Sequence, residues 1–259
     1  MKLVQASVAD EGDGTRDRGQ GAMYAGTPTG SIDVGPTGLT LDISGVATNG
    51  PMWRIPFRPM DNNSTKSGWV TIVGPGKGLC LYEDRQDCTM AGFKTDESRV
   101  LLGRRTLQNQ TAVQTWGTTF QIGGTGAIGS RGWFDTVVHT SVVKKLVFGT
   151  SGTLEVGHSA NAARTPSLLV ANAFTPPTER LNVKTFKTVS GKVTNEEEAP
   201  FGTYEILKFP RTVALDPSLC RYSGSVRGLS VEFSVVDDGT TWKTLKMDVM
   251  KRGAILIFR

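Results

Sequence analysis

Short apolar runs alternate with turn residues along the chain from residue 38 onward. The runs are rich in Val, Ile, Thr and aromatic residues, and Gly, Pro, Asn or Asp bounds them, which is the signature of β-strands. The clearest of them occupy residues 38–45, 68–74, 78–83, 118–124 and 134–150. Because close turns separate these runs, the pattern predicts an all-β protein with little helix.

Two connecting segments are predicted from their local residues. Residues 95–107 begin with Thr95, a suitable helix N-cap, and the acidic residues that follow would stabilise a first helical turn. We expect a helix of one or two turns there. Residues 74–78 read Gly-Pro-Gly-Lys-Gly and predict a hairpin turn between the strand-like runs on either side.

The clearest alternation of apolar and polar residues lies in residues 229–249. Two alternating runs flank Asp238-Gly239, a pair that favours the tight turn of a β-hairpin. The predicted inward row of this hairpin is Leu229, Val231, Phe233, Val235, Leu245, Met247 and Val249. The following run, residues 253–259, is apolar almost throughout and predicts a strand that is buried on both faces.

Residues 1–37 have a different composition from the rest of the chain. After a strand-like run at residues 3–8, Gly, Asp, Arg and Thr dominate, and too few apolar residues are present for this segment to fold alone. We predict an extended N-terminal arm that becomes ordered against a neighbouring subunit. The large apolar side chains expected to make the assembly contacts are Met23, Tyr24, Ile32 and Val34.

Together these elements predict a β-sandwich or a jelly-roll-like body. Pro176-Pro177 can continue neither a helix nor a central strand, so this pair marks a linker or a corner. The predicted organisation is an arm at residues 1–37, a β module at residues 38–175 and a second β module at residues 178–259. A single continuous β domain after the arm is the alternative.

The 259 residues carry a formal net charge of +5, which favours contact with nucleic acid or an acidic surface. The Lys and Arg residues are dispersed, however, so nucleic-acid binding is not favoured as the main role. The first residues lack a signal-peptide core, and no run reaches membrane-spanning length. We therefore expect synthesis in a host cytoplasm, without secretion or a membrane span, and Cys80 and Cys88 reduced rather than paired.

The motifs that could carry chemistry are weak. Residues 124–129 match a dinucleotide-binding glycine pattern, but a β-branched run follows them where that chemistry needs a helix. Asp135 and His139 would lie about 13 Å apart along a strand, too far for a catalytic pair. Asp237-Asp238 fits the hairpin turn, and neither histidine has a metal-ligand partner at a recognised spacing. The sequence predicts no catalytic residues, no cofactor and no metal.

The five tryptophans offer a different possibility, because exposed aromatic rings bind sugars. Trp242 falls on the strand face opposite Leu245 and Met247, so we expect it to be exposed and available as an aromatic contact. The favoured interpretation is that most of the five tryptophans are core or interface anchors.

The sequence favours a non-enzymatic structural subunit of a larger assembly. A Gly-rich arm, a large β body and scarce catalytic groups fit a virus or phage virion protein of the capsid, tail, adaptor or matrix type, which binds copies of itself and other subunits. A carbohydrate- or receptor-binding β domain is the alternative, and a β-rich hydrolase is a distant third.

Overall fold

The computed structural model describes residues 2–4, 31–45, 53–54, 58–60, 66–82, 90–103, 112–131, 139–159, 168–189, 192–195, 201–224, 226 and 228–251. These residues form β-strands and one short 3-10 helix, η1 (Pro217–Leu219). The prediction of an all-β protein with little helix is therefore confirmed.

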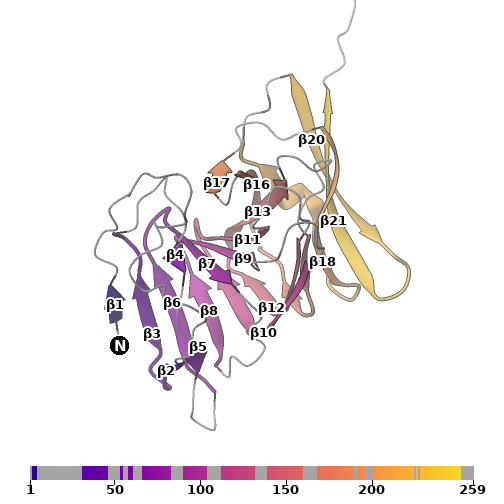
Figure 1. Ribbon diagram of the computed structural model, residues 1–259. Coiled ribbons are helices and arrows are strands. Elements are labelled where there is room, and N and C mark those ends of the chain that lie inside the picture. Colours follow the sequence, from indigo (N-terminus) through magenta and orange to yellow (C-terminus); the bar gives the residue numbers. More distant parts are fainter. Residues whose placement is uncertain are drawn as a thin grey trace, which may run out of the picture.

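Two long sheets and one small sheet contain all the described strands (Figure 1). The major sheet has the order β1 (Lys2–Val4), β3 (Leu39–Asp42), β6 (Trp69–Val73), β8 (Gly92–Thr95), β10 (Ala112–Ile122), β12 (His139–Phe148), β14 (Leu168–Ala171), β18 (Gly202–Pro210), β21 (Trp242–Lys251) and β20 (Leu229–Asp237), with β15 (Phe174–Thr175) also paired to β12. The minor sheet has the order β17 (Lys192–Asn195), β16 (Arg180–Val189), β13 (Ser151–Ser159), β11 (Ala127–Arg131), β9 (Arg99–Gly103), β7 (Gly78–Tyr82) and β4 (Trp53–Arg54), with β19 (Cys220–Tyr222) also paired to β16. Strands β2 (Ser31–Asp33) and β5 (Arg58–Met60) form the small sheet.

The chain coils between the two long sheets, so the fold is a β-solenoid. From β6 to β13 each strand lies in the opposite sheet from the strand before it, and each pairs in parallel with its equivalent in the next coil. The prediction of a β-sandwich or jelly roll is therefore wrong. Short β-branched runs separated by turns fit both architectures, because a strand's own sequence does not show whether its neighbour runs parallel or antiparallel.

Columns of apolar side chains build the core between the two sheets. Paired positions of the major sheet align Leu39, Val70, Phe93, Phe120, Leu146 and Phe174, all of them buried. Paired positions of the minor sheet align Leu79, Val100, Ile128, Leu154 and Val183. Phe93 and Phe120 stack with ring centroids 5.4 Å apart. The aligned residues lie at unequal spacings along the chain, so the coils do not follow a fixed sequence period.

The corners between the sheets account for two incorrect predictions. Residues 99–103 form strand β9, so the predicted helix at residues 95–107 is wrong. Thr95 Oγ1 does accept the N–H of Ser98 at 2.9 Å, as a helix N-cap would, but here the bond closes a corner that leads into a strand. Residues 74–77 connect β6 to β7 in the other sheet, so the predicted hairpin turn at residues 74–78 is also wrong.

Pro176-Pro177 lies at the corner between β15 and β16, as one of the two sequence interpretations expected. Both long sheets continue past this corner, because β14 pairs with β18 and β13 pairs with β16. The boundary proposed between residues 175 and 178 is thus crossed by strand pairing on both sides of the solenoid.

The predicted C-terminal hairpin is confirmed. Strands β20 and β21 pair antiparallel from Leu229 with Lys251 to Asp237 with Lys243, and Gly239 has the positive φ of 78° that the turn requires. Strand β21 also pairs antiparallel with β18, so the major sheet changes from parallel to antiparallel beyond the last coils. The hairpin lies at the opposite end of the sheet from β1 (Figure 1).

The arm residues are described only in part. Val34 is 4% exposed and belongs to the solenoid core, so its side chain is buried within the subunit itself. The backbone of Ile32 lies in β2, paired with Pro59 of β5. Met23 and Tyr24 lie outside the described residues, as does the predicted strand at residues 253–259. An arm that contacts neighbouring subunits stays a prediction.

Candidate functional site: the C-terminal three-stranded face

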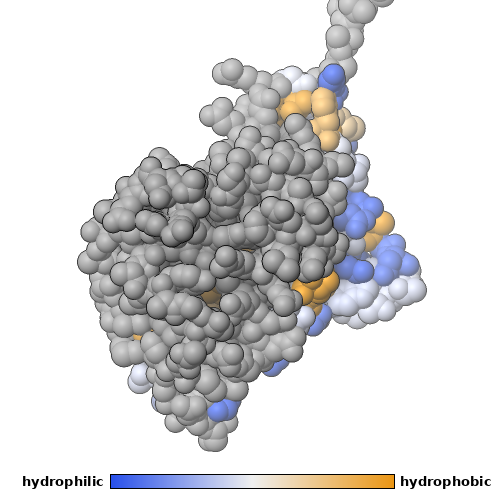
Figure 2. Space-filling view, viewed as in Figure 1, coloured by the Kyte–Doolittle hydropathy of each residue, from blue (hydrophilic) through white to orange (hydrophobic). Residues whose placement is uncertain are grey.

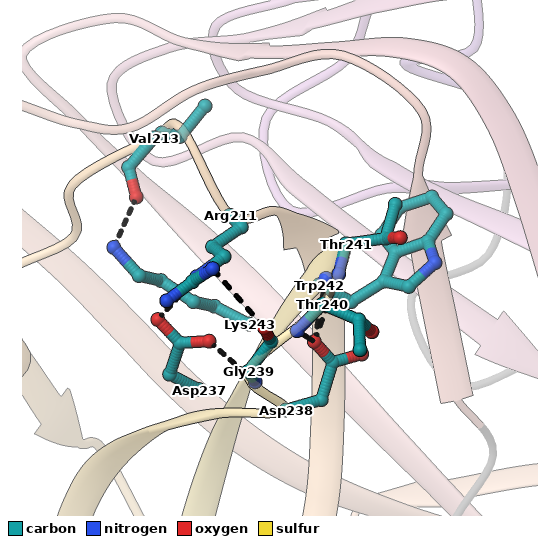
Figure 3. A network of polar contacts seen from close by, with 9 residues as sticks. All are labelled: Arg211, Val213, Asp237, Asp238, Gly239, Thr240, Thr241, Trp242 and Lys243. Carbon is teal, nitrogen blue, oxygen red and sulfur yellow. Dashed lines mark hydrogen bonds and ion pairs between the residues drawn. The ribbon is translucent and has the colours of Figure 1, made fainter.

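The turn of the C-terminal hairpin is organised around Asp238 (Figure 3). The Asp238 carboxylate accepts the backbone N–H of Thr240 at 2.8 Å and those of Thr241 and Trp242 at 3.0 Å. These hydrogen bonds, led by the one from Trp242, lower the pKa of Asp238 to about 2. An aspartate followed by glycine folds in this way because its short side chain bonds to N–H groups of its own turn.

Asp237 joins the hairpin to the chain that leaves β18 (Figure 3). One carboxylate oxygen accepts the N–H of Gly239 at 2.8 Å, and the other pairs with Nε of Arg211 at 3.0 Å. The Gly239 hydrogen bond, followed by the one from Arg211, lowers the pKa of Asp237. Lys243 Nζ adds a bond of 3.1 Å to the carbonyl of Val213. Both carboxylates therefore act as hydrogen-bond acceptors that hold the turn, as the sequence predicted for Asp237-Asp238.

Trp242 lies beside this turn on the outer face of β18, β21 and β20. Its ring is half-buried, and Lys208 Nζ lies 5.5 Å from the ring centroid. Lys208 pairs with Thr244, and Thr244 pairs with Val236, which is 44% exposed. The predicted exposure of Trp242 is met only in part, because the Lys208 side chain covers some of the ring.

Trp242 and Val236 form one apolar patch, and a second apolar patch lies at the other end of the same face. Phe201 is 46% exposed and Met250 is 40% exposed. Lys251 Nζ lies 5.1 Å from the centroid of the Phe201 ring. Between the two patches runs a polar strip that includes an ion pair between Lys246 and Glu205 at 3.1 Å. Figure 2 shows apolar and hydrophilic residues interspersed on this side of the molecule.

Strand β20 is an edge of the major sheet. It pairs with β21 on one side, and among the described residues no strand pairs with its other side, although η1 lies against it. Its inward row, Leu229, Val231, Phe233 and Val235, is half-buried and packs against the core cluster. The inward row of β21, Leu245, Met247 and Val249, is fully buried. Core side chains are thus less buried on β20 than on β21. The side of β20 that faces away from β21 is called the free edge below.

The glycine pattern at residues 124–129 is a corner of the solenoid. Asp96 O accepts the N–H groups of Thr125 and Gly126, and strand β11 follows at Ala127 where a nucleotide-binding fold would begin a helix. A side chain at Gly124 would place its Cβ 2.6 Å from the backbone oxygen of Asp96. Close packing of successive corners therefore accounts for the glycines.

The remaining sequence candidates are not brought together in the described residues. His139 begins β12, but Asp135 lies outside the description. Cys80 lies in β7 and Cys88 lies outside, so their pairing is not addressed. Cys220 is a buried free thiol whose pKa is raised to about 12 by burial. The described part of the chain contains no group of three side chains suited to hold a metal ion.

Sequence reasoning missed one buried ion pair. Glu155 of β13 and Arg99 of β9 form two hydrogen bonds, both 2.7 Å long, across strand β11. The two residues are 56 positions apart, and only the stacking of coils places them on the same face. No local pattern signals such a pair, because the number of residues in each coil varies.

No protein-family model matches the sequence, and neither a curated protein nor a solved structure shows significant similarity to it. Within the residues that the structure describes, none of the helical segments has the length and apolar character needed to cross a bilayer.

Proposed function

We propose that the protein is a non-enzymatic structural subunit of a larger assembly, and specifically a virus or phage virion component. The observation that carries this proposal is the free edge of β20 with its half-buried apolar row. An open edge with unpaired backbone groups is a template for pairing with another chain, and proteins that stay monomeric usually cover or charge it. In β20 the charged residues are Glu232 and Asp237, and the inward row of the strand is apolar.

The solenoid architecture supports an assembly role. Coils that stack along one axis leave a sheet edge at each end, and such proteins need caps or neighbours at those ends. The antiparallel strands β18, β21 and β20 extend the major sheet at one end, and they present two apolar patches on their outer face as well as the free edge. These features are suited to contacts between subunits.

The assignment to a virion rests on the sequence. The Gly-rich composition of residues 1–30 resembles that of arms that fold only on a neighbouring subunit, and the body is all-β. Capsid, tail, adaptor and matrix proteins combine these two features. We propose that the chain is made in a host cytoplasm and binds copies of itself and other subunits of the particle.

Negative-stain electron microscopy of the purified full chain, with light scattering on the same sample, tests this proposal. We expect rings, tubes or shells of defined size whose mass is a multiple of 27.8 kDa. A monomer that forms no particle at any concentration, alone or with the other components of its source particle, would contradict the proposal.

Trp242 supports a second candidate function, binding of a carbohydrate or a glycan-bearing receptor. The half-buried indole beside Lys208 and Thr244 combines an aromatic surface with polar groups, the combination on which sugars stack and form hydrogen bonds. A glycan array tests it, with Trp242→Ala expected to lose binding that the wild type shows. Phe201→Ala is the matched control, because Phe201 is a second aromatic residue beside a lysine on the same face.

A further inference from the structure

Among the described residues no strand pairs with the outer edge of β20, and the core beside it is incompletely covered. Phe233 and Met247 are cross-strand partners, yet Met247 is fully buried while Phe233 stays half-buried. The same contrast separates Val235 from Leu245 and Val231 from Val249. One additional strand beside β20 would cover this row and bury its apolar surface.

The backbone of β20 is oriented to accept such a strand. The N–H of Asp238 donates to the carbonyl of Trp242, so this pair is a hydrogen-bonded pair of the antiparallel ladder. Hydrogen-bonded and non-hydrogen-bonded pairs alternate, which makes the odd-numbered residues of β20 non-hydrogen-bonded toward β21. Their N–H and carbonyl groups therefore point toward the free edge. Consistent with this, the N–H of Leu229 donates to Val226 O rather than to β21.

The chain contains a segment whose sequence matches this edge. Residues 253–259, Gly-Ala-Ile-Leu-Ile-Phe-Arg, are apolar on both faces of a strand, so whichever face turns inward can cover the half-buried row of β20. Charge is compatible as well: residues 229–238 contain three acidic residues and no basic residue, whereas residues 253–259 contain one basic residue, Arg259, and no acidic residue. Like charges would therefore not oppose each other along the new pairing.

We propose that residues 253–259 of a second copy of this chain add as a strand to the free edge of β20. This inference rests on the proposed function, because it names the partner and the surface of the assembly. It is a β-augmentation, in which backbone hydrogen bonds hold the strand and apolar side chains fix its register. Reciprocal exchange between two copies would give a closed two-fold dimer.

A second copy fits better than the chain's own segment. Lys251 pairs with Leu229, so the chain leaves β21 at the end of β20 where Val226 and Gly228 lead into that strand. To reach the free edge of its own β20, the chain would have to cross those entering residues within Arg252 and Gly253. In a straight line that crossing spans two strand spacings, about 10 Å, and the three Cα–Cα steps from Lys251 to Ala254 extend at most about 11 Å. No length remains for the detour around the backbone of β20, which lies in that line. A neighbouring copy approaches the edge without this constraint.

A proline on the free edge tests the proposal. The N–H of Val235 points away from β21, so Val235→Pro leaves the hairpin ladder intact but blocks a new strand. Val235→Ala is the matched control, because it removes the same apolar contact and keeps the N–H. In sedimentation equilibrium of the full chain, we expect Val235→Pro to weaken self-association by about tenfold or more. The control should weaken it clearly less.

Complementation of two full-length variants separates this proposal from the proposed function. Val235→Pro has a blocked edge and an intact C-terminal segment, whereas Ile255→Asp combined with Leu256→Asp has the reverse. At a concentration where the wild type associates and each variant alone is largely monomeric, a mixture of the two should form heterodimers. Equal association of Val235→Pro and wild type, or no heterodimer in the mixture, overturns the strand exchange and leaves the assembly role standing. A wild type that never associates overturns both.

Circular dichroism melts exclude misfolding, and the double variant keeps the test valid if Val235→Pro does not fold.

Discussion

The guanidinium group of Arg99 binds both carboxylate oxygens of Glu155 across an intervening strand, with each bond 2.7 Å long. The Glu155 side chain is 3% exposed, and the Arg99 side chain is 19% exposed. Strand β11 passes between the two residues and offers Ala127 and Gly129 in the paired positions. Small residues there leave room for the bridge, so three successive coils are linked on one face of the minor sheet.

Arg99→Ala should destabilise the protein strongly. The substitution leaves the Glu155 carboxylate buried without its partner, and the expected loss is about 3 kcal/mol in the free energy of unfolding by urea. Arg211→Ala is the control, because its pair with Asp237 is exposed and should contribute at most about 1 kcal/mol. Equal losses for the two variants would show that the buried pair does not stabilise the stack of coils.

Gly129→Ala should also destabilise the minor sheet. An added Cβ would lie 2.4 Å from the backbone oxygen of Glu155 and 3.0 Å from Leu101 Cδ2, so the strands must separate. We expect a cost of about 1–3 kcal/mol in thermal or urea unfolding. Gly149→Ala is the control, since its Cβ would meet its nearest neighbour at 3.5 Å, and it should change stability by less than about 0.5 kcal/mol.

Side-chain burial decreases from β21 to β20, and this predicts the order of the stability losses that substitutions in the hairpin cause. Met247→Ala, at a fully buried position, should cost about 2–5 kcal/mol. Phe233→Ala, at its half-buried partner on β20, should cost less, about 2 kcal/mol. Glu232→Ala on the exposed face should change stability by at most about 0.5 kcal/mol. A larger loss for Phe233→Ala than for Met247→Ala, measured in dilute monomer, would contradict the assigned edge.

The hairpin turn should contribute to a dependence of stability on pH. The pKa of Asp238 is lowered to about 2 in the folded protein, so the charged carboxylate stabilises the fold above its ordinary pKa near 3.8. That contribution is lost as the pH falls from about 4 toward 2. The stability difference between wild type and Asp238→Asn should therefore shrink over this range in urea unfolding. A difference that stays constant from pH 7 to pH 2.5 would show that the charge of Asp238 does not stabilise the turn.

The sequence predicts those parts of the fold that depend on residues close together in the chain, and misses those that depend on residues far apart. The hairpin of β20 and β21 was predicted with its faces and its turn, because alternation and Asp238-Gly239 are local signals. The coiling was not, because the column that joins Phe93, Phe120 and Leu146 comes from pairing between coils of unequal length. Thr95 illustrates the difference: its capping bond was predicted, but the next coils make the following residues a strand.

The candidate site shows the same division. The turn carboxylates and the outward face of Trp242 were identified from turn chemistry and strand alternation, but the Trp242 ring is half-buried where the sequence predicted exposure. The free edge of β20 was not predicted, because an edge is a property of sheet order and not of the strand's own residues. The assembly contacts expected from Met23 and Tyr24 stay a prediction, while Val34 lies in the core.

Hydrogen exchange at individual amides of β20 tests the central claim most directly. The account predicts that the N–H groups of Val231, Phe233 and Val235 exchange rapidly in a dilute monomer, because they point toward the free edge. It predicts strong protection of the same three amides in the concentrated, assembled protein, while Ser234, which is bonded to β21, is protected in both states. Exchange at Val231, Phe233 and Val235 that is equally fast in both states would contradict assembly through this edge.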